Sequence, residues 1–329
     1  MTVYLTLVIA GTAFGAVLTP LVSTASSALG LVDAPGGRKV HSVSVPRLGG
    51  VAIACAAALA LAAVTFLDPL PGGAPADLGT IAPILIGGVL VLAVGVVDDV
   101  TGLPPWPKLV VQLAAALIVM QADLRVERVT VAGQTWQLGL WSWPVTLVWI
   151  VGLTNAFNFI DGVDGLAAGV SVIAGATCAT ILVSRGHVAE AMLLAALVGA
   201  ALGFLVYNFS PASIFLGDGG SLLFGFVLAT TAVTGWQKGA TALAAGVPLL
   251  IFALPIADAG STLLRRMFRR NQRGGLSVWA ALARVVEPDR EHIHHRLLRL
   301  GLSPRRTVAL LYALTLLFSA LALATAQLN

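Results

Sequence analysis

The segment from Asn155 to Leu166 combines two carboxylates, Asp161 and Asp164, with two amides, Asn155 and Asn158. It lies between apolar runs that are long enough to cross a membrane. Charged groups at membrane depth are costly, so their presence in such a setting calls for a functional explanation. The segment therefore predicts part of a functional site.

Two further acidic sites, Asp98-Asp99 and Asp218, lie at the ends of other apolar runs. Carboxylates, amides and glycines without cysteine ligands suit a hard cation such as Mg²⁺, for which Mn²⁺ can substitute. Mg²⁺ usually takes one or two carboxylates and completes its coordination shell with water and substrate phosphate oxygens. If the three acidic sites share one side of the membrane, they predict a single polyanionic site for a metal and a phosphate.

A run from Asp289 to Arg296 adds donors that could hold a diphosphate. Helical spacing would place His292, His295 and Arg296 on adjoining faces. The histidines do not predict a zinc site, because tetrahedral partners for such a site are missing. A basic, metal-binding site at the bilayer surface favours phosphoryl transfer to or from a lipid, where the protein mainly supplies position and charge stabilisation.

The elements that must position these groups are membrane helices. The chain has 329 residues, is 58% hydrophobic and 10% charged, and has a mean hydropathy of +0.94. Soluble domains are about 45–50% apolar and about 25% charged. We predict one integral membrane domain over residues 1–329, an all-α polytopic fold without a separate soluble domain. Ten spans are expected, at residues 2–24, 48–67, 80–97, 107–122, 140–159, 166–184, 189–207, 220–236, 241–264 and 307–325. The number becomes eleven if residues 265–306 or a terminal helix are divided differently.

The orientation of these spans follows from the basic residues. With the N-terminus outside, fifteen of the nineteen Lys and Arg residues fall in inside connections. The four in outside connections are Arg125, Arg128, Arg185 and Lys238. The same topology brings all three acidic sites to the cytosolic face. The basic balance therefore marks cytosolic loops of a cell-membrane protein, and nucleic acid is not expected as a partner.

Two smaller features complete the prediction. Alternating residues on either side of Ala132-Gly133 predict a small β-hairpin on the extracytoplasmic face. Cys55 and Cys178 both fall in apolar runs and are expected to be small core residues without a disulfide.

Five segments together resemble a known family, the polyprenyl-phosphate N-acetylhexosamine-1-phosphate transferases of glycosyltransferase family 4. The similarity is to the undecaprenyl- and decaprenyl-phosphate branch, which starts O-antigen, teichoic acid or arabinogalactan linkers. The matching segments occur in family order and are residues 38–50, 97–103, 155–166, 215–221 and 292–297. Any one of them is a modest signal, whereas five in order are specific.

The resemblance implies the first membrane step of cell-envelope polysaccharide synthesis. A lipid phosphate oxygen would attack the β-phosphate of a UDP-amino sugar, giving polyprenyl-diphosphate-sugar and UMP, with Mg²⁺ required. Direct attack is preferred over a covalent aspartyl intermediate. UDP-GlcNAc is the favoured donor. UDP-GalNAc and a 6-deoxy amino sugar stay open, because the cytosolic segment 265–306 that would read the sugar is the least predictable part. A homodimer is compatible with the resemblance.

The resemblance also implies roles for single residues. Asp218, with Asp164, would bind the metal; Asp98 would be the base on the lipid phosphate, and Asp99 would assist it. Asp161 and Asp164 would hold nucleotide or metal, and His292 and His295 would act on the sugar diphosphate. The remaining substrate contacts would come from Asn155, Asn158, Phe215, His294, Arg296, His41 and Arg47.

Two other classes of protein compete with this interpretation. Intramembrane carboxylates also occur in ion-coupled transporters, but there they lie near the midplane, and no inverted repeat is visible in this sequence. A non-catalytic scaffold is disfavoured because every acidic position of the motifs is filled. Asp258, in the ninth predicted span, is left open between a structural and a functional role.

Overall fold

The computed structural model describes residues 1–33, 44–67, 78–131, 134–237, 246–268 and 292–327. Long helices dominate it. In chain order they are α1 (Thr2–Ala28), α2 (Gly49–Leu67), α3 (Ala82–Thr101), α4 (Pro105–Gln121), α5 (Ser142–Ile160), α6 (Leu166–Ser184), α7 (Val188–Asn208), α8 (Gly217–Gln237), α9 (Gly246–Ile251), α10 (Ala253–Phe268), α12 (Ile293–Arg299) and α13 (Pro304–Gln327).

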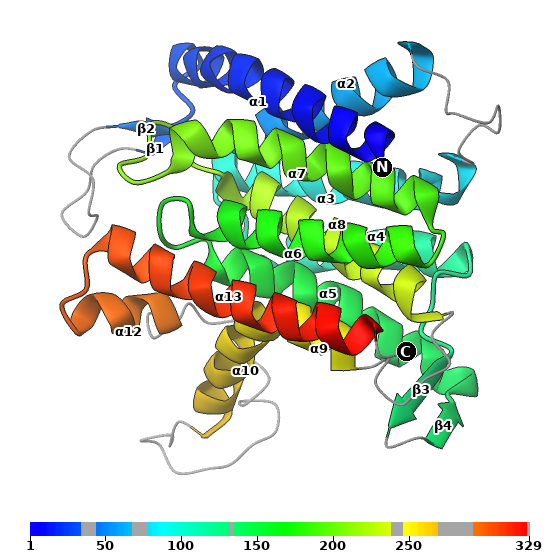
Figure 1. Ribbon diagram of the computed structural model, residues 1–329. Coiled ribbons are helices and arrows are strands. Elements are labelled where there is room, and N and C mark those ends of the chain that lie inside the picture. The colour runs from blue at the N-terminus through cyan, green and yellow to red at the C-terminus, as the bar shows by residue number, and fades with distance from the viewer. Residues whose placement is uncertain (34–43, 68–77, 132–133, 238–245, 269–291, 328–329) are drawn as a thin grey trace.

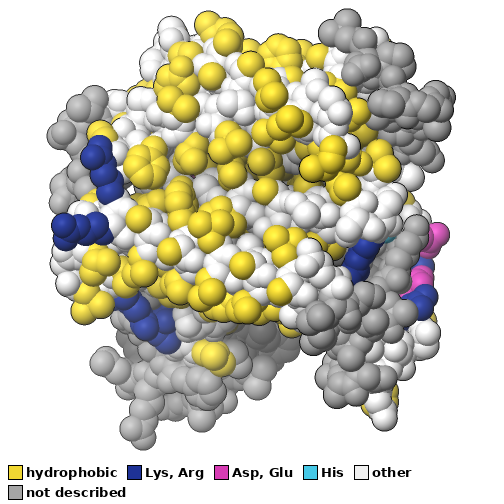
Figure 2. Space-filling view, in the orientation of Figure 1, with side chains coloured by type: hydrophobic (Ala, Val, Ile, Leu, Met, Phe, Trp, Pro, Cys, Tyr) yellow, Lys and Arg dark blue, Asp and Glu magenta, His cyan; other side chains and the backbone are white. Residues whose placement is uncertain are grey.

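Most of these helices run roughly along one common direction, as a bundle (Figure 1). Seven of them are long and apolar enough to cross a membrane: α1, α2, α3, α5, α6, α7 and α13. Helix α4 is apolar but shorter, with 17 residues. On the face shown in Figure 2, hydrophobic side chains cover the middle of the molecule, and Lys and Arg lie toward its two ends. An apolar belt between charged ends is the surface expected of a polytopic membrane protein.

The ninth predicted span is not one helix. Helix α9 ends at Ile251 and α10 begins at Ala253, while residues 241–245 lie outside the described part. Pro255 has no N–H group to donate to the carbonyl of Ile251, four residues earlier, so the helix is interrupted there. Figure 1 shows α10 leaving the bundle at a steep angle. The predicted continuous span over 241–264 was therefore wrong.

Three helices are brought into close contact by glycines. A Cβ atom on Gly95 of α3 would lie 2.5 Å from the backbone of Gly219 on α8. A Cβ atom on Gly225 of α8 would lie 2.6 Å from the Cα of Thr154 on α5. Small residues let membrane helices approach this closely. Helix α8 is thereby held between α3, which carries Asp98 and Asp99, and α5, which ends just before Asp161.

Two pairs of short strands lie at opposite ends of the bundle (Figure 1). Strand β3 (Arg128–Val131) pairs antiparallel with β4 (Gln134–Gln137), at the end where α4 finishes. Strand β1 (Val32–Asp33) pairs antiparallel with β2 (Val45–Pro46), at the end where α3 and α5 finish. The acidic residues therefore gather at the β1–β2 end.

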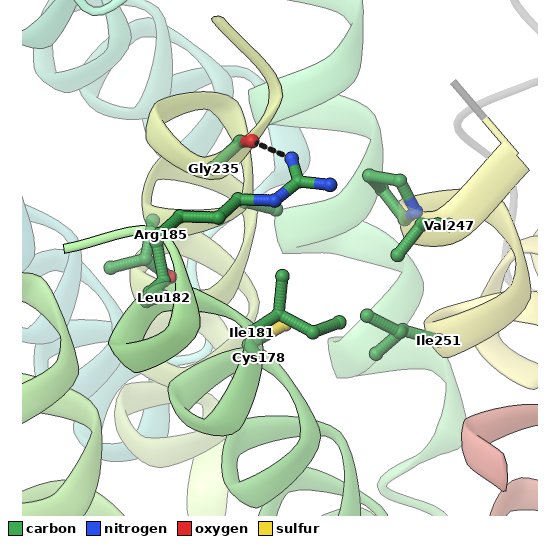
Figure 3. A pocket seen from close by; sticks show the side chains of 10 residues that line it. Cys178, Ile181, Leu182, Arg185, Gly235, Val247 and Ile251 are labelled. Atoms are coloured by element: carbon green, nitrogen blue, oxygen red, sulfur yellow. Dashed lines mark hydrogen bonds between the residues drawn. The ribbon is translucent and has the colours of Figure 1, made fainter. Parts of the chain in front are cut away.

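The other end contains a small cavity of about 30 Å³, shown in Figure 3. Apolar side chains line it, and Arg185 reaches across to donate a hydrogen bond to the carbonyl of Gly235. Cys178 is buried beside it, as predicted, and neither cysteine forms a disulfide. Cys55 is exposed on α2, so its predicted core position was wrong.

Candidate active site

A lysine joins two of the three acidic sites. Lys108, in the first turns of α4, donates hydrogen bonds to Asp98 (2.6 Å) and to Asp218 (2.9 Å). The turn between α3 and α4 makes this reach feasible. Gly102 ends α3 with φ of 67°, and the following prolines restart the helix at Pro105. Asp98 and Asp218, 120 positions apart in the chain, thus share one ammonium group.

Asp99 holds the helix that carries Asp218. Its Oδ1 accepts a hydrogen bond from the backbone N–H of Asp218 (2.9 Å), and its Oδ2 accepts one from Gly219 (3.1 Å). These are N–H groups at the first turn of α8, which have no partner within the helix. Gly217 precedes them with φ of 76°, and a Cβ atom there would collide with the Asp99 carboxylate. Asp99 therefore acts as an N-terminal cap supplied by another helix.

The two amides of the segment from Asn155 to Leu166 link α5 to its neighbours. Asn158 donates to the hydroxyl of Ser221 (2.9 Å), one turn beyond Asp218 on α8. Asn155 donates to Gln112 (2.6 Å) on α4, one turn beyond Lys108. Helix α5 is therefore positioned by hydrogen bonds to α4 and α8, two of the three helices that form the Lys108 bridge.

Asp161 and Asp164 lie in the turn between α5 and α6. Asp164 accepts a hydrogen bond from the backbone N–H of Ala212 (3.0 Å). Burial raises the pKa of Asp161 well above its ordinary value. The carboxylates of Asp218, Asp99 and Asp164 raise that pKa further. All three predicted acidic sites therefore meet at one end of the bundle, close enough for their charges to interact.

The donors at this end fit a hard divalent cation. They are carboxylate and amide oxygens, and the carboxylates of Asp218, Asp99 and Asp164 lie close enough to Asp161 to raise its pKa. Among the residues that the structure describes, no group of three or more His, Cys, Asp or Glu could hold a metal ion alone. Mg²⁺ does not need such a group, because water and substrate phosphates supply most of its ligands.

The histidine segment, which is His292 together with α12, packs against the Asp161–Asp164 turn. His292 precedes α12 and lies against Phe159 of α5, with 5.5 Å between ring centroids. His294 is 2% exposed, and a Cβ atom on Gly162 would collide with its Nε2. Burial lowers the pKa of His294 to about 4, so its ring is neutral at neutral pH. The rings of His294 and His295 are 4.3 Å apart.

Other predicted residues lie around this centre. Phe215, just before α8, donates its N–H to the carbonyl of Pro46 (2.8 Å), while Arg47 pairs with Asp33. The strand pair β1–β2 is thereby joined to the start of α8. Arg296 is exposed on α12, and His41 lies outside the described residues.

Sequence reasoning missed three residues at the centre. Lys108 was counted only for topology, and Gln112 and Ser221 were given no role. A signal for Lys108 existed: it is the sole charged residue of an apolar helix that begins a few residues after Asp98-Asp99. Asp258, left open, accepts a hydrogen bond from His292.

The sequence of this chain is similar to those of known proteins. Residues 81–236 match glycosyl transferase family 4. A probable undecaprenyl-phosphate N-acetylglucosaminyl 1-phosphate transferase of Bacillus subtilis is 34% identical, over 92% of this chain and 79% of that protein. A decaprenyl-phosphate N-acetylglucosaminephosphotransferase of Mycolicibacterium smegmatis is 35% identical, over 86% of this chain and 72% of that protein. An undecaprenyl-phosphate alpha-N-acetylglucosaminyl 1-phosphate transferase of Escherichia coli is 27% identical, over 86% and 73%. The chain therefore belongs to glycosyl transferase family 4, in the branch of these polyprenyl-phosphate N-acetylglucosaminyl 1-phosphate transferases.

Proposed function

We propose that this protein transfers GlcNAc-1-phosphate from UDP-GlcNAc to polyprenyl phosphate, giving polyprenyl-diphosphate-GlcNAc and UMP. The observation that carries the proposal is the meeting of Asp98, Lys108 and Asp218 beside the Asp161–Asp164 turn and the histidine segment. The names of the relatives supply the donor sugar and the lipid class. In this reaction the protein mainly positions two phosphate-bearing substrates and offsets their charge.

The lipid phosphate would lie at the Asp98 side of the site. Asp98 lies in the last turn of α3, close to the start of α4, so a phosphate at the membrane surface could approach it. Asp98 would act as a base and accept the proton of the lipid phosphate. The lipid phosphate oxygen would attack the β-phosphorus of the nucleotide sugar, and UMP would leave. Lys108 would keep Asp98 and Asp218 in place while the phosphates bind.

Asp218 and Asp164 would hold Mg²⁺, which when bound would neutralise diphosphate charge. Asp161 would lie beside these two carboxylates. The hydrogen bond from Asn158 to Ser221 would fix the distance between the end of α5 and α8. Phe215 would stack on the uracil ring. The segment 265–306, with His292, His295 and Arg296, would bind the sugar diphosphate, and His41 and Arg47 would contribute from the β1–β2 side.

The site would face the cytoplasm, and the β3–β4 hairpin would face outward across the cell membrane. This orientation follows from the basic residues of the connections. Among the residues that the structure describes, those that lie at the same end as the acidic site are Arg47, Lys108, Arg296, Arg299, Arg305 and Arg306. The orientation also matches the chemistry, because a nucleotide sugar is a soluble, charged substrate that must reach the site from water.

The test is transfer by purified protein with polyprenyl phosphate and Mg²⁺, measured as UMP release and labelled lipid. UDP-GlcNAc, UDP-GalNAc, a UDP-6-deoxy amino sugar and UDP-MurNAc-pentapeptide are compared in parallel. UDP-GlcNAc should be used best, and omission of the divalent cation should stop turnover. Release of no UMP from any of the four donors would refute the transferase. Asp218→Asn should abolish activity, and full activity in that variant would contradict the metal assignment.

A further inference from the structure

Asp258 makes two hydrogen bonds at the start of the histidine segment. It lies on α10, and only 1% of its surface is exposed. Its Oδ2 is 2.7 Å from Nδ1 of His292, and its Oδ1 accepts a hydrogen bond from the N–H of Ile293 at 2.6 Å. A buried carboxylate is costly unless it is paired, so this geometry is not incidental.

The ring that Asp258 holds has a defined place. His292 lies against Phe159, the residue after Asn158 on α5. Its ring is parallel to that of His294 at 5.7 Å, and His294 packs on Gly162 in the acidic turn. The position of His292 therefore determines how α12 lies over the Asp161–Asp164 turn.

We propose that Asp258 is a positioning residue, which orients His292 toward the sugar diphosphate and fixes its tautomer through Nδ1. With Nδ1–H donating to Asp258, Nε2 is the nitrogen that remains for the substrate. This inference rests on the proposed function, because it names the donor's diphosphate as the group that His292 meets.

The two oxygens of Asp258 allow its two roles to be separated. Asp258→Asn retains an oxygen that can accept the hydrogen bond from the N–H of Ile293. It places an NH2 group, which cannot accept a hydrogen bond, against Nδ1 of His292. Asp258→Ala removes both bonds. If Asp258 positions His292, Asp258→Asn should raise KM for UDP-GlcNAc or lower kcat by about 10- to 100-fold, the effect typical of losing such an orienting partner. If it only caps α12, Asp258→Asn should behave like the wild type and Asp258→Ala alone should fail.

Hydrogen exchange of residues 293–299 in the full-length protein gives a readout independent of turnover. Protection should persist in Asp258→Asn and fall in Asp258→Ala. Loss of protection in Asp258→Asn would overturn the assignment to the His292 ring. The two proposals can also fail separately. If residues 293–299 lose protection only in Asp258→Ala but the wild type releases no UMP, the proposed function fails while the Asp258–His292 contact stands.

A double-mutant cycle shows whether Asp258 acts through His292. In a His292→Ala background, Asp258→Asn should have little further effect on the residual activity. An equal loss in both backgrounds would overturn the proposal. The matched control is Glu190→Gln, because Glu190 is also buried and lies 3.8 Å from a histidine, His187, at the opposite end of the bundle. It should leave kcat and KM unchanged.

Discussion

At the scale of single residues, the Lys108 ammonium group bridges two carboxylates, Asp98 and Asp218, that would otherwise repel each other. It is within 3 Å of Asp98 and of Asp218, and the Lys108 and Asp98 side chains are 19% and 11% exposed. Water screens such a group only partly, so its charge acts strongly on both partners. The lysine therefore links the acid that would meet the lipid phosphate to the acid that would meet the metal.

Lys108→Met should lower kcat/KM by about 10²- to 10³-fold, the range found when one electrostatic stabiliser is removed from an active site. UMP release measures this loss. Arg128→Met removes the same charge from an exposed position on β3, at the other end of the molecule, and should be active. Wild-type activity in Lys108→Met would show that the bridge has no part in turnover.

The acidic residues of the site could be predicted because a charge stands out in an apolar sequence. Their partners could not. Lys108 is 110 residues from Asp218, and Asp258 is 34 residues from His292, so neither pairing has a local pattern. The role of Asp99 as a cap of α8 is hidden for the same reason, since caps are usually sought next to their own helix.

At the scale of elements, glycines decide how closely the histidine segment and the acidic turn approach each other. Gly162 lies between Asp161 and Asp164, and the imidazole of His294 occupies the space that a side chain would need. Because His294 is almost fully buried, it cannot move aside without displacing α12. The contact therefore transmits the position of the turn to His292 and His295.

Gly162→Ala should push α12 away from the turn and lower activity by about tenfold or more, since small displacements of positioning groups are costly in catalysis. Gly152→Ala is the matched control. It lies in α5, and a Cβ atom there would meet nothing within 4 Å. The control should retain activity and be at least as stable as the wild type. Equal activity of the two variants would contradict a tight contact between His294 and the turn.

Most helices could be predicted from hydropathy because long apolar runs in lipid have little choice but to be helical. The ninth span failed because a run of apolar residues carries no sign of a break unless its prolines are examined. Pro255 removes one donor, and the chain changes direction between α9 and α10. The span over 220–236 began three residues late, since α8 starts at Gly217 with its polar first turn at the site.

At the scale of the whole molecule, the acidic groups lie together at one end of the bundle. Helix α3 brings Asp98 to its last turn, α5 ends just before Asp161, and α8 carries Asp218 in its first turn. An ion-coupled carrier would place such groups near the midplane, where both sides have alternating access. A site at one end, joined to a basic histidine segment, instead suits a soluble donor and a membrane-borne acceptor.

This arrangement predicts a fixed orientation that chemical labelling can test. In a background with Cys55 and Cys178 replaced by serine, Arg299→Cys marks α12, and Trp136→Cys marks β4, where the side chain is 63% exposed. In sealed right-side-out vesicles, a membrane-impermeant maleimide should label Trp136→Cys and spare Arg299→Cys until the vesicles are opened. Four described arginines, Arg296, Arg299, Arg305 and Arg306, lie in α12 and at the start of α13, so the positive-inside rule requires this order. The reverse order would put the acidic site outside the cell, away from nucleotide sugars, and would contradict both the topology and the proposed donor.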